Sequence, residues 1–348
     1  MEKLRPIRFG LGGIKGLGTG AAEAIIEERK ENGAYNSIFD ITTRLSNRVI
    51  GRKGLESLIY AGAFDCFDKI ERGRYFPLEG TENSDVIELA LQYGARIQQD
   101  KLSSQFNLFA GGTAVEVSVP EIPMAEPWAL IKKLNFEREV IGFYLSAHPL
   151  DKYKTEMKFF TNCTVQQLLS EEGLFRTVEM QRREQRLGGV ITQVTEKTSQ
   201  KGSKYGIFTI EDFTGALDVS VFGEDYAKFS RFITQNNSLL ILGFFQPGFR
   251  NPDIYEFKIR DIQLLDSVLE KLTRELVIEL NLKQIEPIFI DNLYNLLNQQ
   301  PKGGCAVKFA IMEPTMGRIA LLSRTLVIKI NASIVKALQD LEVEIKLK

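Results

Sequence analysis

The stretch from Leu187 to Phe222, LGGVITQVTEKTSQKGSKYGIFTIEDFTGALDVSVF, decides the fold of its part of the chain. Apolar and polar residues alternate along it with a period of two, which is typical of half-buried β-strands. Together with the residues that follow, it predicts strands near 187–196, 204–210, 216–222, 238–246 and 254–264. A helix is predicted near 224–233, between the third and fourth strands. Five strands with a helix at that place are the pattern of the OB fold, a partly open Greek-key barrel.

Basic and aromatic residues gather around the first two of these strands. Residues 176–204 hold seven basic side chains against three acidic ones, although the net charge of the whole chain is −1. OB folds bind single strands with basic side chains for the backbone and aromatic rings for the bases. The candidate DNA-binding residues here are Arg182, Arg183, Arg186, Lys197, Lys201, Lys204 and Tyr205. Phe208 and Phe222 lie in strands that need a core, so we expect both to be buried.

A second candidate site lies near the N-terminus, where short helices alternate with glycine-rich turns. The sequence IKGLGTGA, residues 14–21, has the hydrophobic-Gly-hydrophobic-Gly form of a helix-hairpin-helix turn. Its glycines would let the backbone approach a phosphate, and N–H groups at the start of the next helix would donate to it. The candidate residues are Lys15, Gly16, Gly18, Thr19 and Gly20. A glycine-rich turn that binds nothing remains an alternative, and a second hairpin near Gly62 has only one glycine.

A third candidate is the peptide Gln105-Phe106-Asn107-Leu108-Phe109, between a polar helix predicted at 83–104 and a Gly/Pro-rich linker. Exposed apolar side chains in a linker are unfavourable unless they dock on a partner or on the chain's own core. The last part of the chain follows the order strand, helix, two strands, helix, strand, which predicts a small α+β domain.

The fold class is therefore multidomain: an all-α helix-hairpin-helix module, a β OB-fold barrel and a small α+β C-terminal domain. The predicted domains are a tandem helix-hairpin-helix module, a linker with the peptide, a helical connector, the OB fold and the α+β domain. Their respective residue ranges are 1–104, 105–127, 128–175, 176–270 and 271–348.

Composition limits the catalytic and metal chemistry, and the cellular compartment, that the sequence predicts. The chain has one histidine, His148, which precedes a proline and is interpreted as structural. Its three cysteines are far apart in sequence, which favours neither a zinc site nor a disulfide framework and suits a reducing cytoplasm. No apolar run approaches the ~20 residues that span a bilayer. We expect a cytoplasmic protein without metal sites or cofactors of its own.

Four stretches together resemble the bacterial DNA polymerase III alpha subunit. They are IRFGLGGIKGLGTGAAEAIIEER (7–29), LESLIYAGAFD (55–65), FEREVIGFYLSAHPLDKY (136–153) and YGIFTIEDFTGALDVSVF (205–222). The resemblance implies the C-terminal part of that subunit, which handles duplex and single-stranded DNA. It implies that Gln105–Phe109 binds the β sliding clamp, since that peptide fits the family's clamp-binding pattern. In some members the terminal domain also contacts the clamp loader's tau subunit.

The resemblance also implies what lies elsewhere. The family's polymerase is a nucleotidyltransferase whose Mg²⁺ ions are held by an Asp-x-Asp palm motif, and this sequence has no Asp-x-Asp. We therefore expect this part alone to be catalytically inactive, and Met1 to be an artificial start within a longer natural chain. The alternatives are an OB and hairpin fragment of another DNA-processing enzyme, such as an NAD-dependent DNA ligase, or a tRNA-binding OB protein. The ligase has the reverse domain order and four zinc-binding cysteines.

Overall fold

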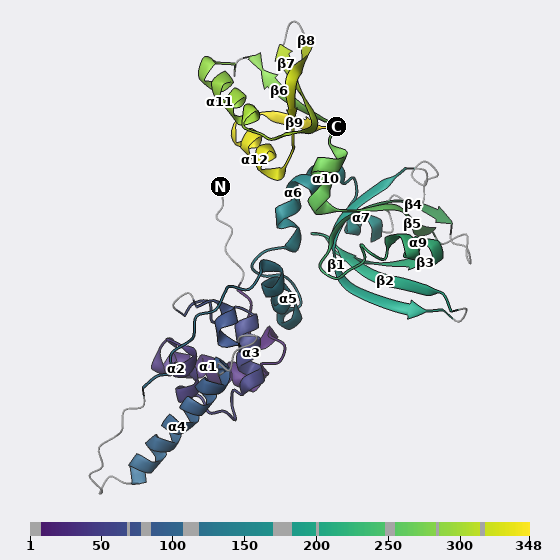
Figure 1. Ribbon diagram of the computed structural model, residues 1–348. Coiled ribbons are helices and arrows are strands. Elements are labelled where there is room, and N and C mark those ends of the chain that lie inside the picture. The colour runs from purple at the N-terminus through teal and green to yellow at the C-terminus, as the bar shows by residue number, and fades with distance from the viewer. Residues whose placement is uncertain are drawn as a thin grey trace. The chain divides into compact units, whose positions relative to one another are not determined.

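The structure is a computed structural model that describes residues 8–67, 70–77, 85–106, 118–169, 183–199, 202–247, 255–282, 285–313 and 317–348. Within these ranges the side chains of 102–106, 255–256, 312–313 and 317–318 are not described. The chain divides into two compact units, Met1–His148 and Pro149–Lys348 (Figure 1).

The first unit is helical. Its elements are η1 (Leu11–Gly13), α1 (Thr19–Asn32), α2 (Ile38–Arg44), α3 (Arg52–Tyr60), η2 (Arg72–Tyr75), α4 (Val86–Phe106) and α5 (Leu130–Ile141). Capping at the helix ends and burial of the apolar side stabilise these short helices. The Ser37 hydroxyl caps α2 by accepting from the Asp40 N–H at 3.1 Å. Ile25 of α1, Leu55 of α3 and Ile87 of α4 then meet in one core.

The predicted connector at 128–175 is shared between the two units. Val140 of α5 belongs to the core of the first unit. The second unit begins with η3 (Pro149–Tyr153), α6 (Lys154–Phe160) and α7 (Val165–Leu169). Val165 and Leu168 of α7 pack into the core of the five-stranded sheet. The five-part domain division stays a prediction, because the chain divides into only two compact units.

The second unit contains the predicted OB sheet. Its strands are β1 (Gln185–Thr198), β2 (Lys204–Glu211), β3 (Ala216–Phe222), β4 (Ser238–Pro247) and β5 (Tyr255–Leu264), with α9 (Gly223–Phe229) after β3. All neighbours are antiparallel, in the order β3-β2-β1-β4-β5. Leu187, Phe208 and Ile241 fill its core, which confirms the OB fold.

Within the described residues the sheet does not close into a barrel, in keeping with the partly open form of the predicted OB fold. In the part of the chain that the structure describes, no hydrogen-bonded ladder joins β3 to β5. β4 has a register shift between Leu242 and Gly243, a β-bulge of the kind that bends strands locally. The two edges therefore leave a seam along one side of the OB domain.

The predicted α+β domain follows α10 (Leu265–Leu272). Its elements are β6 (Glu275–Asn281), α11 (Pro287–Asn298), β7 (Lys302–Glu313), β8 (Gly317–Ile328), α12 (Ala332–Asp340) and β9 (Glu344–Leu347). The sheet order is β8-β7-β6-β9, with β6 parallel to β7 and the other pairs antiparallel. Leu293 and Leu297 of α11 and Val335 of α12 cover the sheet (Figure 1).

Candidate nucleic-acid interface

The turn before α1 is held from inside by its two large apolar residues. Ile14 and Leu17 are buried in the core of the first unit, whereas Lys15, Gly16 and Gly18 are exposed. The Lys15 N–H also donates to the carbonyl of Val140, at 2.8 Å, which ties the turn to the end of α5. The alternation of buried apolar and exposed glycine residues thus presents the backbone of the turn to solvent.

The glycines of this turn have different tasks. Gly16 has φ +92°, and a Cβ there would lie 2.6 Å from the Ser57 hydroxyl, so its role is close packing as well as turning. Gly18 has φ +76°, caps α1 without any side-chain hydrogen bond, and has open space where a Cβ would lie. Gly20 is open as well. The first N–H groups of α1 have no partners within the helix, and the glycines leave them accessible.

Two candidate side chains stand beside these N–H groups, and the structure adds a third. Lys15 and Thr19 are exposed on the same turn. The side chain of Lys53, in the first turn of α3, lies 3.5 Å from the position that a Cβ of Gly16 would occupy. Neither Lys15 nor Lys53 has an ion pair with a described residue. The helix start, the two lysines and the threonine can together bind a phosphate group.

Sequence reasoning missed Lys53 because a turn and two helices separate it from Gly16. The sequence nonetheless contained a signal that points to the start of α3. Ile50 is buried and Gly51 caps α3 without a side-chain hydrogen bond, so the start of α3 repeats the arrangement at the start of α1. Its Arg52 is bound to two carboxylates, those of Glu56 and Asp85.

Gly62, where the sequence suggested a second hairpin, lies at the other end of α3. It follows the C-terminus of the helix with φ +80°, and its missing side chain makes room for the guanidinium of Arg72. The last turn of a helix presents carbonyl groups, which repel a phosphate. Gly62 thus stands at the end of α3, whereas Gly51 stands at its start, as Gly18 does at the start of α1.

The peptide Gln105–Phe109 lies mostly outside the described residues. The backbone of Gln105 and Phe106 forms the end of α4, which runs two residues beyond its predicted end. Their side chains and all of Asn107, Leu108 and Phe109 are not described.

The predicted residues of the OB sheet fall on two faces and at two ends. Lys197 pairs with Tyr205 across β1 and β2, and Tyr205 pairs with Phe222 across β2 and β3, so these three share one face. Lys204, one residue before Tyr205, has the opposite orientation. Its ammonium contacts the Glu196 carboxylate at 2.6 Å.

This ion pair has a third member. The Tyr226 hydroxyl donates to the other oxygen of Glu196, at 2.6 Å. The Lys204 ammonium and the Tyr226 hydroxyl hold the pKa of the Glu196 carboxyl below its ordinary value. Lys197, in contrast, has no ion pair with a described residue. Of these two lysines, Lys197 carries the positive charge that is available to a ligand.

The arginines of the basic stretch stand apart from the lysines. Arg186 lies 11 residues before Lys197 on β1, a separation of roughly 35 Å along an extended strand. Its guanidinium is 3.5 Å from the Glu184 carboxylate, which Arg260 also contacts at 2.5 Å. Arg183 is described and exposed, whereas Arg182 and Lys201 lie outside the described residues. The structure therefore does not bring Arg186 and Lys197 together.

The aromatic residues separate into core and surface. Phe208 is buried as predicted, but the expectation for Phe222 was wrong, because this residue is 59% exposed. The ring of Phe222 stacks on Tyr205, with 5.1 Å between centroids and 25° between planes. Val219 and Val221 face the core on the same strand, so the alternation of the pleat turns Phe222 outward.

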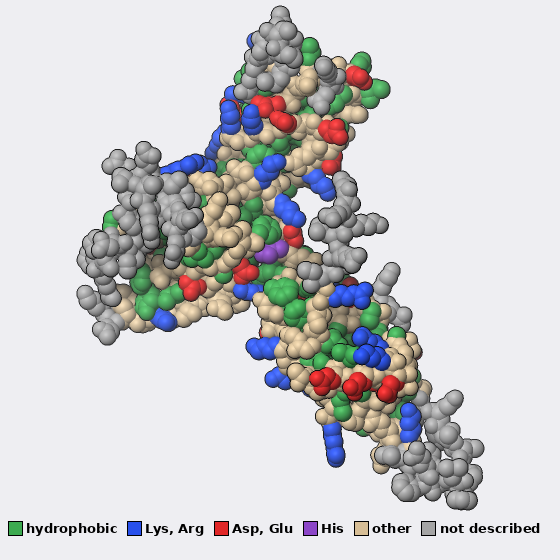
Figure 2. All heavy atoms as spheres, turned by 180° about the vertical axis from the view of Figure 1, so that it is seen from behind, with side chains coloured by type: hydrophobic (Ala, Val, Ile, Leu, Met, Phe, Trp, Pro, Cys, Tyr) green, Lys and Arg blue, Asp and Glu red, His purple; other side chains and the backbone are tan. Residues whose placement is uncertain are grey.

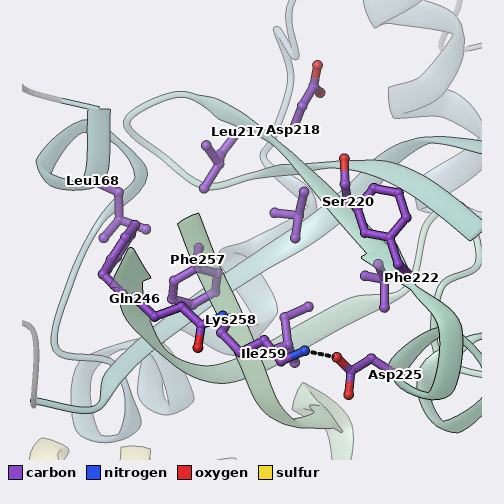
Figure 3. A pocket seen from close by; sticks show the side chains of 13 residues that line it. Leu168, Leu217, Asp218, Ser220, Phe222, Asp225, Gln246, Phe257, Lys258 and Ile259 are labelled. Carbon is purple, nitrogen blue, oxygen red and sulfur yellow. Dashed lines mark hydrogen bonds and ion pairs between the residues drawn. The ribbon is translucent and has the colours of Figure 1, made fainter. Parts of the chain in front are cut away.

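Phe222 also stands at a cleft of about 580 Å³ in the seam between β3 and β5 (Figure 3). Leu168, Val219 and Ile259 line its apolar part. Its other residues include Ser220, Gln246 and an ion pair between Lys258 and Asp225. Phe245 and Phe257, with ring centroids 5.1 Å apart, form a second aromatic pair in the lining.

The remaining surface has mixed charge. Figure 2 shows basic and acidic side chains interspersed over the described part of the face in view, in keeping with a net charge of −1. Among the described residues no group of three or more His, Cys, Asp or Glu side chains could hold a metal ion. None of the described helices has the length and apolar character needed to cross a membrane.

These two modules define a class of nucleic-acid-binding protein. Residues 1–74 match the family described as helix-hairpin-helix motif, and residues 186–265 match the OB-fold nucleic acid binding domain. The α1 turn and the β1–β5 sheet are the structural counterparts of these two matches. Both families point to binding of nucleic acid.

Curated relatives are similar to this chain over most of its length. The chain is 30% identical over 310 residues to DNA polymerase III subunit alpha of Buchnera aphidicola subsp. Acyrthosiphon pisum, covering 86% of this chain and 24% of the relative. It is 30% identical over 308 residues to the same subunit of Thermus aquaticus (88% and 23%) and 28% identical over 311 residues to that of Haemophilus influenzae (88% and 25%). The chain spans about a quarter of the length of these relatives. The resemblance is confirmed: the chain is homologous to the C-terminal region of DNA polymerase III subunit alpha.

Proposed function

We propose that this chain is the DNA-handling and sliding-clamp-binding part of a bacterial replicative DNA polymerase. The observation that carries the proposal is the start of α1, which has no side-chain cap and where Gly18 and Gly20 leave backbone N–H groups open beside Lys15 and Lys53. A site made of backbone donors and flexible cations binds phosphate without reading sequence. A replicative polymerase needs this property, because it must hold every sequence that it copies.

In this proposal the two modules hold different forms of DNA. The hairpin turn binds the duplex backbone through Lys15, Gly16, Gly18, Thr19 and Gly20. The OB sheet binds the single strand, with Lys197 and Tyr205 central and with Lys201, Lys204, Arg182, Arg183 and Arg186 as further candidates. The near-neutral net charge of the chain leads us to expect micromolar or weaker affinity for each module alone.

The β sliding clamp is the proposed protein partner of Gln105–Phe109. Ala110 and then Gly111-Gly112 follow the peptide, and a glycine-rich composition is typical of linkers. Leu108 and Phe109 would anchor in an apolar pocket of the clamp, and Gln105 would set the register by hydrogen bonding.

A second proposed partner is the tau subunit of the clamp loader, at the C-terminal domain. The edge strand β8 exposes Ile319, Leu321 and Leu322, with exposed fractions of 44%, 51% and 59%. An edge strand with exposed apolar side chains favours pairing with another protein. Leu322→Glu should weaken capture of tau, whereas Lys336→Glu, on α12, should not. Equal capture by both variants would remove β8 from the interface.

We place nucleotide incorporation, and the Mg²⁺ ions that it needs, in another part of the polymerase subunit. The carboxylates that hold two catalytic metal ions must be clustered, and this sequence offers no Asp-x-Asp. Two assays on the 348-residue chain test the proposal. Titration with a labelled primer–template should give saturable, salt-sensitive binding, and primer extension with Mg²⁺ or Mn²⁺ should equal a blank without protein. Absence of binding, or incorporation above the blank, would contradict it.

A further inference from the structure

An aromatic pair on the outer face of the OB sheet, half-buried Tyr205 and exposed Phe222, lies outside the core. Tyr205 and Phe222 stack on each other across β2 and β3, and Phe222 is more than half exposed. Phe208, on the opposite face, and Phe229 of α9 are aromatic residues of the core. A large apolar ring that stays exposed beside a cleft is a feature of binding surfaces.

The residues around Tyr205 and Phe222 form one face of the sheet, with a positive charge at one corner and a negative charge at the opposite corner. In strand register the face consists of three rows, Lys197–Tyr205–Phe222, Thr195–Ile207–Ser220 and Gln193–Thr209–Asp218. A cation is at one corner and a carboxylate at the opposite corner, with uncharged residues between them. Asp218 accepts a hydrogen bond from the Thr209 hydroxyl at 2.6 Å, which holds its charge at that corner.

The cleft in the seam continues from the edge of this face. Phe222, Ser220 and Asp218 belong both to the outer face of β3 and to the lining of the cleft (Figure 3). The Lys258 ammonium at the cleft is paired with the Asp225 carboxylate and offers a phosphate no unpaired positive charge, whereas the Phe245–Phe257 pair and the apolar lining favour a flat, uncharged ring. The polar groups of Ser220 and Gln246 can serve the edge of such a ring.

We propose that Tyr205 and Phe222 stack an unpaired nucleobase and that the cleft between β3 and β5 receives the base beside it. The phosphate backbone passes on the Lys197 side of the face, and the bases point toward the β3 edge. This inference rests on the proposed binding of single-stranded DNA by the OB sheet and names the residues that hold the bases. Base–aromatic contacts do not depend on sequence, because every base has a π-face.

The test compares two ligands on the full 348-residue chain: a short oligodeoxythymidylate, and a strand of equal length in which abasic sites replace the bases. Lysines and helix starts contact phosphate, so they bind both strands alike, and only a stacking site prefers the strand with bases. The wild type should prefer the oligodeoxythymidylate by about tenfold or more. Phe222→Leu and Tyr205→Leu should lose most of this preference and keep the affinity for the abasic strand.

Phe213→Leu is the matched control. Phe213 is 48% exposed in the turn between β2 and β3, at the far end of both strands from Phe222, so this variant should behave as the wild type. Melting temperatures of all variants should be equal, because each changed ring is on the surface or half-buried.

The outcomes separate this inference from the function on which it rests. Unchanged preference in Phe222→Leu and Tyr205→Leu would overturn the stacking site, leave single-strand binding in place, and point to an extended peptide as the occupant of the cleft. Equal affinity of the wild type for both strands would also overturn it. No binding of either strand by the wild type would overturn the proposed single-strand function together with it.

Discussion

Arg72 donates a hydrogen bond from Nη1 to Oε1 of Glu137 at 2.9 Å, and both side chains are buried. The other oxygen of Glu137 accepts from the N–H groups of Leu145 and Ser146, at 3.2 and 3.0 Å. The same arginine holds Asp65 through Nη2 at 2.6 Å. One ion pair thus joins the end of α3, the η2 turn and α5, the helix on which the α1 turn is anchored.

Loss of this pair should destabilise the first unit strongly. Arg72→Met leaves a buried carboxylate without its cation, which costs about 3–5 kcal/mol. The single tryptophan, Trp128, packs against Gly73 and Phe136, so its fluorescence reports unfolding of this unit in urea. Arg52→Met is the control, because its ion pairs are partly exposed and should contribute about 1 kcal/mol or less. Equal losses in the two variants would contradict the account.

The start of α1 should matter for duplex DNA, and its end should not. Gly18 and Gly33 both have positive φ and open space for a Cβ, and they cap opposite ends of the same helix. Alanine imposes a similar backbone strain at either position. Only Gly18→Ala places a methyl group beside the phosphate-binding N–H groups, so it alone should weaken duplex binding, by about tenfold. Fluorescence anisotropy with a labelled duplex measures this, and equal affinities would make the turn purely structural.

Lys197, opposite Tyr205 on β1, and Lys204, next to Tyr205 on β2, should not be equivalent. Lys197→Ala removes a cation on the stacking face, so the salt slope of log K for single-stranded DNA should fall by roughly 0.7. Lys204→Ala should change it less, because Glu196 already balances that charge. Titrations in a series of KCl concentrations compare the variants. A larger effect of Lys204→Ala would place the strand on the opposite face.

One of the three thiols should react rapidly. Cys66 is exposed, whereas burial raises the pKa of the Cys163 thiol and of the Cys305 thiol to about 11. At pH 8 only about one in a thousand side chains of Cys163 or Cys305 is therefore a thiolate, the reactive form of cysteine. Dithionitrobenzoate should therefore label one cysteine quickly and the other two only in denaturant, and Cys66→Ser should abolish the fast phase. Three fast thiols would contradict the packing of both sheets.

The local pattern of the sequence determined much of this structure. Alternation within 204–222 predicted the strands and could also have placed Phe222, because Leu217, Val219 and Val221 occupy the other parity. Relations between distant segments had no such signal. Lys53 reaches Gly16 only after α1, α2 and α3 pack, and Glu196 meets Lys204 and Tyr226 only in the folded sheet. The open seam depends on strand tilt and bending, which no local pattern encodes.

The most direct test of the central claim is calorimetry of the chain against the bacterial sliding clamp. A linear peptide orders when it binds, so we expect an affinity near micromolar. Burial of a leucine and a phenylalanine contributes roughly 3–6 kcal/mol before this cost, so Leu108→Ala with Phe109→Ala should weaken binding at least about tenfold. Phe143→Ala with Leu145→Ala is the control, because both side chains are about half exposed in the same unit. The account predicts loss of affinity in the first double variant alone, and equal affinity of that variant and the wild type would contradict it.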